Sequence, residues 1–302
     1  MEEKASITAL MSAFGRAFHA ETEAHPVFAD RLARELMTAE EYAAVQGYLL
    51  SGAQFFEPEL DPAGAEPRAL LRRLVNDHIA PSPLCRAAYT ERALRAAARN
   101  GVQQYVILGA GLDTFAFREP EFLRTHRVFE VDHPLTQADK RARIARAGWA
   151  VPANLTFVPV DFTKDDLAER LLAGGFDPAE MSFFSWLGVA YYLPPEAMEG
   201  TLAALSALCA AESALAFDYP DEEFLVAPQR RVRNTVRMAQ AGGEPMKAAY
   251  SSTELEKLLE KHGFRLAQLL TPGDIQRDII DRAGAELKAM EHVNCCLAVR
   301  KE

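Results

Sequence analysis

Cysteine is scarce in this sequence: there are four in 302 residues, and none has the spacing of a zinc site. Cys85, Cys209 and the adjacent Cys295 and Cys296 stand in apolar stretches, which is typical of buried, reduced thiols rather than of a disulfide framework. No stretch approaches the ~20 consecutive apolar residues of a membrane-spanning helix, and the acidic start does not resemble a signal peptide. These absences predict a cytoplasmic protein that does not act in a membrane.

Positive charge is also in short supply. Lysine and arginine number 33 against 43 aspartates and glutamates, which gives a net charge of -10. Phosphate backbones and anionic lipids repel such a chain, so we expect neither nucleic acid nor membrane as its partner. No cluster of His, Cys, Asp and Glu has metal-ligand spacing, so no metal is expected. The length allows one large domain with a cap.

The glycine-rich turn at residues 109–111 lacks the signature of a phosphate site. The apolar run Tyr105–Leu108 predicts a strand buried on both faces, and Gly109-Ala110-Gly111 follows it at once, so the backbone can turn sharply and approach a ligand. The dinucleotide fingerprint requires a third glycine where Thr114 stands, and no Gly-Lys-Ser/Thr follows. The turn alone is therefore either a site for a ligand without phosphates or simply a tight turn.

Two acids follow the next predicted strands. Val128–Val131 ends in Asp132, and Thr156–Val160 ends in Asp161. In an open parallel sheet, ligands bind beyond the carboxyl ends of the strands. The first acid suits ribose hydroxyls and the second suits an adenine amino group, so with the glycine turn they describe an S-adenosylmethionine pocket. Taken alone, Asp161 could equally cap a helix, and Glu130 is expected to be a strand residue.

Alternating patterns predict an α/β fold with a mostly parallel sheet and helices on both faces. Residues 1–100 are predicted to form a helical N-terminal cap, and 101–302 the core, with an inserted cap segment near 221–250. A helix from Pro83 should end at Asn100-Gly101, and Thr163 should cap the helix after the third strand. The last two strands could include an antiparallel member. The expected strands are 104–109, 127–132, 156–160, 181–186, 214–218, 264–270 and 292–299.

Several of these segments together resemble the leucine carboxyl methyltransferase family. They are Val106–Arg118, Phe129–Pro134, Val158–Phe162 and Phe184–Glu196. The chain is most similar to the bacterial branch of S-adenosylmethionine-dependent methyltransferases, which includes polyketide carboxyl O-methyltransferases. The resemblance runs from about residue 83 to 218. It implies a class I methyltransferase (Rossmann-like) fold with a seven-stranded sheet.

The resemblance also implies roles for individual residues. Arg86, 23 residues before Gly109, would bind the methionine carboxylate of the cofactor, for which a charged Arg–carboxylate pair is suitable chemistry. Leu187 stands where members related to the eukaryotic enzymes carry a glutamate, which leaves an acid-dependent role there open. The cofactor-binding residues that the resemblance implies are Arg86, Gly109, Ala110, Gly111, Asp132, Asp161, Phe162, Trp186 and Leu187.

The function expected from these residues is O-methylation of a small-molecule acceptor, with S-adenosylhomocysteine as the other product. A carboxylate acceptor is already ionised at pH 7 and needs no general base, whereas a phenol or alcohol would benefit from one. Tyr191, His133 and His19 are candidate bases, and Tyr191 could also form a wall of the acceptor pocket. Arg233 and Arg237, four residues apart on one helix face, could bind an acidic acceptor, or they could simply face solvent.

Three alternatives stay open at this point. An NAD(P)-dependent oxidoreductase is the runner-up, although Thr114 in the third-glycine position weighs against it. A protein that binds S-adenosylmethionine without turnover is a second possibility. A protein carboxyl terminus could replace the small-molecule acceptor, since the eukaryotic relatives act on one. The sequence does not predict the oligomeric state.

Overall fold

The computed structural model describes residues 6–59 and 64–301. Its centre is a seven-stranded sheet in the order β3-β2-β1-β4-β5-β7-β6. All neighbours are parallel except β7, which runs antiparallel to both β5 and β6. The predicted class I fold and its antiparallel terminal member are confirmed. The strands are β1 (Gln104–Leu108), β2 (Arg127–Asp132), β3 (Leu155–Pro159), β4 (Ser182–Trp186), β5 (Ala214–Pro220), β6 (Phe264–Leu270) and β7 (Val293–Arg300).

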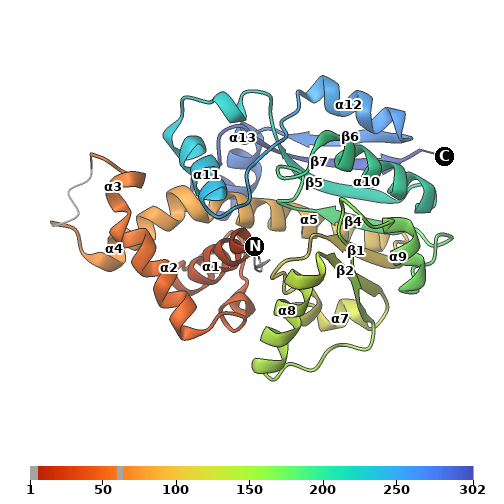
Figure 1. The fold of residues 1–302 in the computed structure, drawn as a ribbon, viewed down its shortest axis with the longest axis horizontal. Helices are drawn as coiled ribbons and strands as arrows, with labels where there is room; N and C mark the ends of the chain where they lie inside the picture. The colour runs from red at the N-terminus through yellow and green to blue at the C-terminus, as the bar shows by residue number, and fades with distance from the viewer. Residues whose placement is uncertain (1–5, 60–63, 302) are drawn as a thin grey trace.

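The middle strands are buried on both faces, as their unbroken apolar runs predict. Successive residues of a strand point to opposite faces, so Tyr105 and Ile107 join one hydrophobic cluster while Val106 and Leu108 join another. The first cluster extends into the N-terminal helices and α5, and the second into α9, α10 and α12. The sheet is therefore the middle of three layers, which Figure 1 shows.

The helices flank this sheet or form the two cap segments. None of those in the described residues is long and apolar enough to cross a membrane. The helical elements are α1 (Ile7–Thr22), η1 (Arg31–Arg34), α2 (Ala39–Ser51), α3 (Ala53–Phe56), α4 (Pro67–Leu74), η3 (Val75–Ile79, a π turn), α5 (Pro81–Arg99), α6 (Phe115–Arg118), α7 (Pro120–Leu123), α8 (Pro134–Arg146), α9 (Leu167–Ala173), α10 (Pro195–Leu208), η4 (Phe224–Val226), α11 (Arg230–Ala241), α12 (Ser252–Lys261), α13 (Pro272–Ile275) and η5 (Gln276–Asp281).

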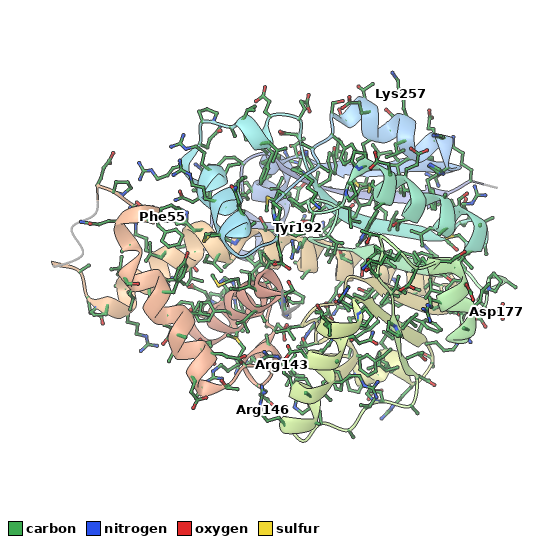
Figure 2. All side chains as sticks on the ribbon, in the orientation of Figure 1. Phe55, Arg143, Arg146, Asp177, Tyr192 and Lys257 are labelled. Atoms are coloured by element: carbon green, nitrogen blue, oxygen red, sulfur yellow. The ribbon has the colours of Figure 1, made fainter. Side chains whose placement is uncertain are left out.

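The N-terminal cap is fastened to the core by buried polar contacts as well as by shared apolar packing. Figure 2 shows Arg143 and Arg146 of α8 facing the cap helices. Arg143 forms a two-pronged ion pair with Glu41 of α2, with both distances 2.7 Å. Both arginines donate to the carbonyl oxygen of Leu36, which precedes that helix. Two-pronged arginine–carboxylate pairs fix orientation as well as distance, so this contact sets how the cap sits on the sheet.

The inserted segment 221–250 has the predicted form of one long helix and a loop, preceded by the short turn η4. In Figure 1, α11 lies between the cap helices and the end of the sheet. Phe224 and Val232 of this segment pack with Tyr191 and with Met290 and Val293 from the last strand region. The insert therefore rests on the loop after β4 and on the start of β7.

One helix start differs from the prediction. Asp166, not Thr163, caps α9, because Asp161 accepts the backbone N–H and the hydroxyl of Thr163 and holds 161–165 in a turn. The helix begins only after that turn ends.

Candidate active site

A cavity of about 890 Å³ opens at the carboxyl ends of the parallel strands. It lies where the strand order reverses between β1 and β4, the usual ligand position in open α/β sheets. The loops after β1, β2, β3 and β4 form one wall, and the N-terminal cap and the insert form the other. This volume falls within the range of small-molecule sites and is large enough for a cofactor and an acceptor together.

The glycine turn after β1 is a cradle that only glycine can form. Gly109 and Gly111 have φ values of 69° and 48°, the left-handed region that side chains rarely adopt. A Cβ on Gly109 would overlap the side chain of Val189, and one on Gly111 would come 3.2 Å from Ala9. The N–H groups of Gly109 and Ala110 donate to Val131, so the turn is held against β2. The missing side chains therefore let Val189 and the start of α1 pack against the turn, which lines the cavity.

Asp132 lies directly beside that turn. Its carboxylate accepts the N–H of Gly111 through Oδ2 and the N–H of His133 at 2.6 Å through Oδ1. Burial raises the pKa of Asp132, and the two N–H groups act against that shift. The carboxylate has lone pairs to spare at the tip of β2, where ribose hydroxyls can donate to it.

Asp161 and Phe162 line the cavity after β3. Burial acts to raise the pKa of Asp161, but Lys164, 2.8 Å from Oδ2, and the Thr163 hydroxyl and N–H outweigh it and lower the pKa to about 2. This carboxylate is therefore a charged acceptor at pH 7. The His133 ring is half-exposed at the same edge, with Nε2 3.9 Å from Asp161 Oδ2.

Arg86 reaches the cavity from α5 on the other side of the glycine turn. Its Nη1 lies 3.2 Å from Asp218 Oδ2. Gly188 has a φ of 68°, and a Cβ there would overlap the guanidinium, so the loop after β4 packs tightly on the arginine. The loop and the guanidinium therefore hold each other in place.

Asp218, the partner of Arg86, is a site residue that was not predicted from the sequence. It is completely buried in β5, and it accepts the Gly188 N–H at 2.6 Å and the Tyr191 hydroxyl at 2.7 Å in addition to Arg86. The available signal was an aspartate within the apolar strand 214–220, because a buried carboxylate requires charged or donor partners.

The remaining predicted residues divide into those at the cavity and those away from it. Leu187 and Tyr191 line the cavity, but Trp186 does not: its indole is buried in the cluster that faces α9 and α10. Strand alternation explains this correction, since Trp186 is the last residue of β4 and points to that face. Burial raises the pKa of Tyr191 well above its usual value, which makes its hydroxyl a poor base at pH 7. His19 is buried inside the cap, where its Nε2 accepts the N–H of Val27.

Arg233 and Arg237 do share a helix face, but it is the outer face of α11. Both are exposed, and neither lines the cavity, whereas Thr235 and Met238 of the same helix do. Arg233 donates to the carbonyl oxygen of Pro228. The structure therefore agrees with the interpretation that these two arginines face solvent. It does not agree with the one in which they bind an acidic acceptor.

Thr114 shows why the third glycine is missing. It is buried, its hydroxyl donates to Asp30 Oδ1 at 2.7 Å, and it accepts from Arg118 Nε at 2.9 Å. Asp30 also pairs with Arg16 of α1 at 2.9 Å. The position whose glycine allows close helix–strand packing in dinucleotide-binding folds serves here to join the cap to the core.

In the part of the chain that the structure describes, no group of three or more His, Cys, Asp or Glu side chains is placed to hold a metal ion. The polar groups that the cavity presents are instead an arginine, which donates, and two carboxylates, which accept; the N–H groups of the glycine turn already donate within the protein. This set suits a ligand with a carboxylate, a ribose and an adenine, and it offers no phosphate site.

The sequence model of leucine carboxyl methyltransferase matches residues 9–206. The chain belongs to the leucine carboxyl methyltransferase family. YktD of Bacillus subtilis, named as an S-adenosyl-L-methionine-dependent methyltransferase, is 37% identical over 303 residues, 99% of each chain. Rv3787c of Mycobacterium tuberculosis, named in the same way, is 32% identical and covers 89% of this chain and 87% of its own. This family member is an S-adenosylmethionine-dependent methyltransferase.

Solved structures agree on the fold. A Thermobifida fusca protein described as a methyltransferase superposes with a TM-score of 0.59 at 16% identity, covering 99% of this chain and 96% of its own. A protein of Streptomyces avermitilis reaches 0.57, also at 16% identity, with coverages of 96% and 97%. Because the identities are this low, the superpositions establish only the architecture, helical cap included, and nothing about the acceptor.

Proposed function

We propose that this leucine carboxyl methyltransferase family member methylates an oxygen, specifically a carboxylate, of a small-molecule acceptor. The observation that carries the proposal is a cavity in which a glycine cradle, Arg86 and two carboxylates form one wall and a largely apolar cap forms the other. The first wall offers hydrogen-bond and ion-pair partners for the polar groups of a nucleoside with an amino-acid tail. The second wall leaves space for an organic acceptor beside it.

The proposed cofactor contacts follow the chemistry of each side chain. Arg86 would hold the methionine carboxylate, and Asp132 the ribose hydroxyls. Asp161, as a charged acceptor, would take the adenine amino group, with Phe162 against the ring. When bound, S-adenosylmethionine supplies a sulfonium methyl, which is already a good electrophile, and S-adenosylhomocysteine is the product. Gly109, Ala110, Gly111 and Leu187 complete this wall.

The protein's own contribution would be positioning and exclusion of water. A carboxylate acceptor carries its negative charge at pH 7, so no side chain has to remove a proton. Tyr191 fits this view, because its hydroxyl donates to Asp218 and is not available as a base. It would act as a wall of the acceptor site. No metal takes part in this proposal.

The test is calorimetric titration of wild type and Asp132→Ala with S-adenosylmethionine, S-adenosylhomocysteine and NAD, followed by transfer of a labelled methyl group to a panel of carboxylic acids. We expect micromolar binding of both sulfur ligands, at least about 100-fold weaker in the variant, and base-labile methyl ester products. Binding of NAD alone would support the oxidoreductase instead. Binding of the sulfur ligands without methyl transfer to any carboxylic acid or protein carboxyl terminus would support the alternative of a protein that binds S-adenosylmethionine without turnover.

A further inference from the structure

The cap wall of the cavity is apolar, and its charged groups are already paired. Leu10, Phe28, Val45, Met238 and Met290 are among its side chains. The charged groups that it contributes have partners within the cap and core: Asp30, Glu41 and Arg16 form the ion pairs described above, and Glu244 accepts the backbone N–H of Thr8. An acceptor held here therefore gains mainly from apolar contact.

His78 differs from the rest of this wall. It belongs to the π turn Val75–Ile79, it lines the cavity, and its side chain is only 1% exposed. Its Nε2 lies 3.3 Å from Glu57 Oε1, while its Nδ1 is buried with no hydrogen-bond partner among the described residues. A buried polar atom without a partner costs about 1–3 kcal/mol, and such atoms call for an explanation.

The chemistry of the groups around His78 decides which of its two ring nitrogens carries the proton. A carboxylate can only accept, so the Nε2 of His78 must be the donor to Glu57. Glu57 also pairs with Arg73, whose Nη2 lies 2.8 Å from Oε2. Burial lowers the pKa of His78; Glu57 and Asp77 act in the opposite direction and Arg231 in the same one. The ring is therefore neutral at pH 7, and Nδ1 is left with a lone pair.

We propose that His78 recognises the methyl acceptor: its Nδ1 accepts a hydrogen bond from an O–H or N–H group on an otherwise apolar molecule. The proposal rests on the proposed function, since it takes the cap half of the cavity as the acceptor site. Nδ1 is buried as the ring stands, so a ligand would reach it after a small turn about the soft Cβ–Cγ torsion that keeps Nε2 directed at Glu57.

The recognised group is not the oxygen that receives the methyl. His78 precedes Arg86 by eight residues along an almost continuous helical path, which corresponds to roughly 12 Å of rise. Arg86 belongs to the cofactor wall, so His78 contacts the far end of the acceptor. The expected ligand is an apolar acid with a hydroxyl or amino group remote from its carboxylate.

The experiment uses three matched probes: p-cresol, 4-fluorotoluene, which lacks the donor, and 4-methylbenzoate, which carries an anion. Their binding to the full chain is measured by ligand-observed NMR, with and without S-adenosylhomocysteine. We expect wild type to bind p-cresol roughly five- to tenfold more tightly than 4-fluorotoluene, the effect of one hydrogen bond. His78→Phe should abolish this preference, and His78→Gln, whose amide oxygen can accept, should keep part of it.

An exposed histidine of the same cap provides the control, and His25→Gln should leave the preference as in wild type. The ¹⁵N spectrum of the imidazoles should show His78 as the neutral tautomer protonated on Nε2. Equal preference in wild type and His78→Phe, failure of p-cresol to bind at millimolar concentration, or a His78-dependent preference for 4-methylbenzoate would each overturn the proposal. Because probe binding is measured without cofactor as well, these results are independent of whether S-adenosylmethionine binds.

Discussion

The two walls of the cavity are built by different means. On the sheet side, the ligand-facing groups stand at strand ends, and backbone turns with positive φ at Gly109, Gly111 and Gly188 set their positions. On the cap side, apolar side chains from α1, α2, η3 and α11 converge from positions as far apart as Leu10 and Met290. The sheet wall tolerates little change in its backbone, whereas the cap wall is a packing surface that side-chain substitution can reshape.

The difference implies a division of roles. In the proposed function, the groups that would contact the cofactor are placed by rigid, local geometry, and the groups that would contact the acceptor are placed by tertiary packing. Four substitutions would break or sharpen the contrast.

The largest effect is expected for Gly109→Ala. Its φ of 69° disfavours a side chain, and the new Cβ would overlap Val189. We expect S-adenosylhomocysteine binding to fall at least about 100-fold in calorimetry, because the turn itself must move. Gly148→Ala is the matched control: its φ is 72°, but nothing lies within 4 Å of the added Cβ. It should cost about 1–2 kcal/mol of stability and leave binding unchanged. Equal losses of binding in both variants would contradict the cradle.

Asp218→Asn should come next. Loss of the charge behind Arg86 should weaken S-adenosylhomocysteine binding roughly tenfold, since the guanidinium is no longer held in place. Binding of 5′-methylthioadenosine, which lacks the amino-acid part, should change little. Asp221→Asn, three residues on, is the control, because the Asp221 carboxylate lies 3.0 Å from His292 rather than beside Arg86. An equal loss for both ligands would mean that Asp218 supports the fold in general rather than the arginine.

A smaller effect is expected where the cap joins the core. Thr114→Val removes the hydroxyl that donates to buried Asp30, and it should lower the free energy of unfolding by about 1–2 kcal/mol in urea titration. Thr201→Val is the counterpart in α10, where the hydroxyl bonds only to Ala197 within the same helix. The free energy of unfolding should fall less in that variant. A greater fall for Thr201→Val would show that the hydroxyl between cap and core does not contribute more to stability than one within a helix.

The last effect is a pH dependence of the cap, which is the smallest of the four at pH 7 and grows in acid. Burial lowers the pKa of His19 to about 4, against 6.5 for the free side chain. The unfolded chain therefore binds a proton that the folded chain does not between pH 6.5 and 4, so stability should fall as the pH drops through that window, by up to about 3 kcal/mol in all. His19→Gln, which can still accept the Val27 N–H, should flatten this part of the stability profile. An unchanged profile would place the acid sensitivity elsewhere.

Most of the sheet wall could be predicted from the sequence. The strands β2 and β6 have the predicted bounds, and the other strands differ by one or two residues. Apolar runs followed by Gly or Asp are local signals, and topology then brings their ends together without further information. Local signals failed where side chains compete for the same backbone, as at Thr163, where Asp161 forms its own turn first.

The cap wall could not be predicted in the same way. The positions of His78 and Asp30 at the cavity depend on how α1, η3 and α11 pack, and helical periodicity alone does not reveal which helix meets which. Arg233 and Arg237 illustrate the limit. Their four-residue spacing correctly places them on one face of α11, but only the tertiary structure shows that this face is turned outward.

The two ends of the described chain have unequal positions, and this matters for handling the protein. The first helical turn of α1 lines the cavity, and the backbone N–H of Thr8 donates to Glu244 in the loop after α11. The chain's last strand, β7, runs antiparallel to β5 and finishes at the end of the sheet opposite the cavity (Figure 1). An affinity tag or surface tether fused ahead of residue 6 would therefore emerge at the mouth of the cavity. The same tag at the other terminus would leave ligand entry unobstructed.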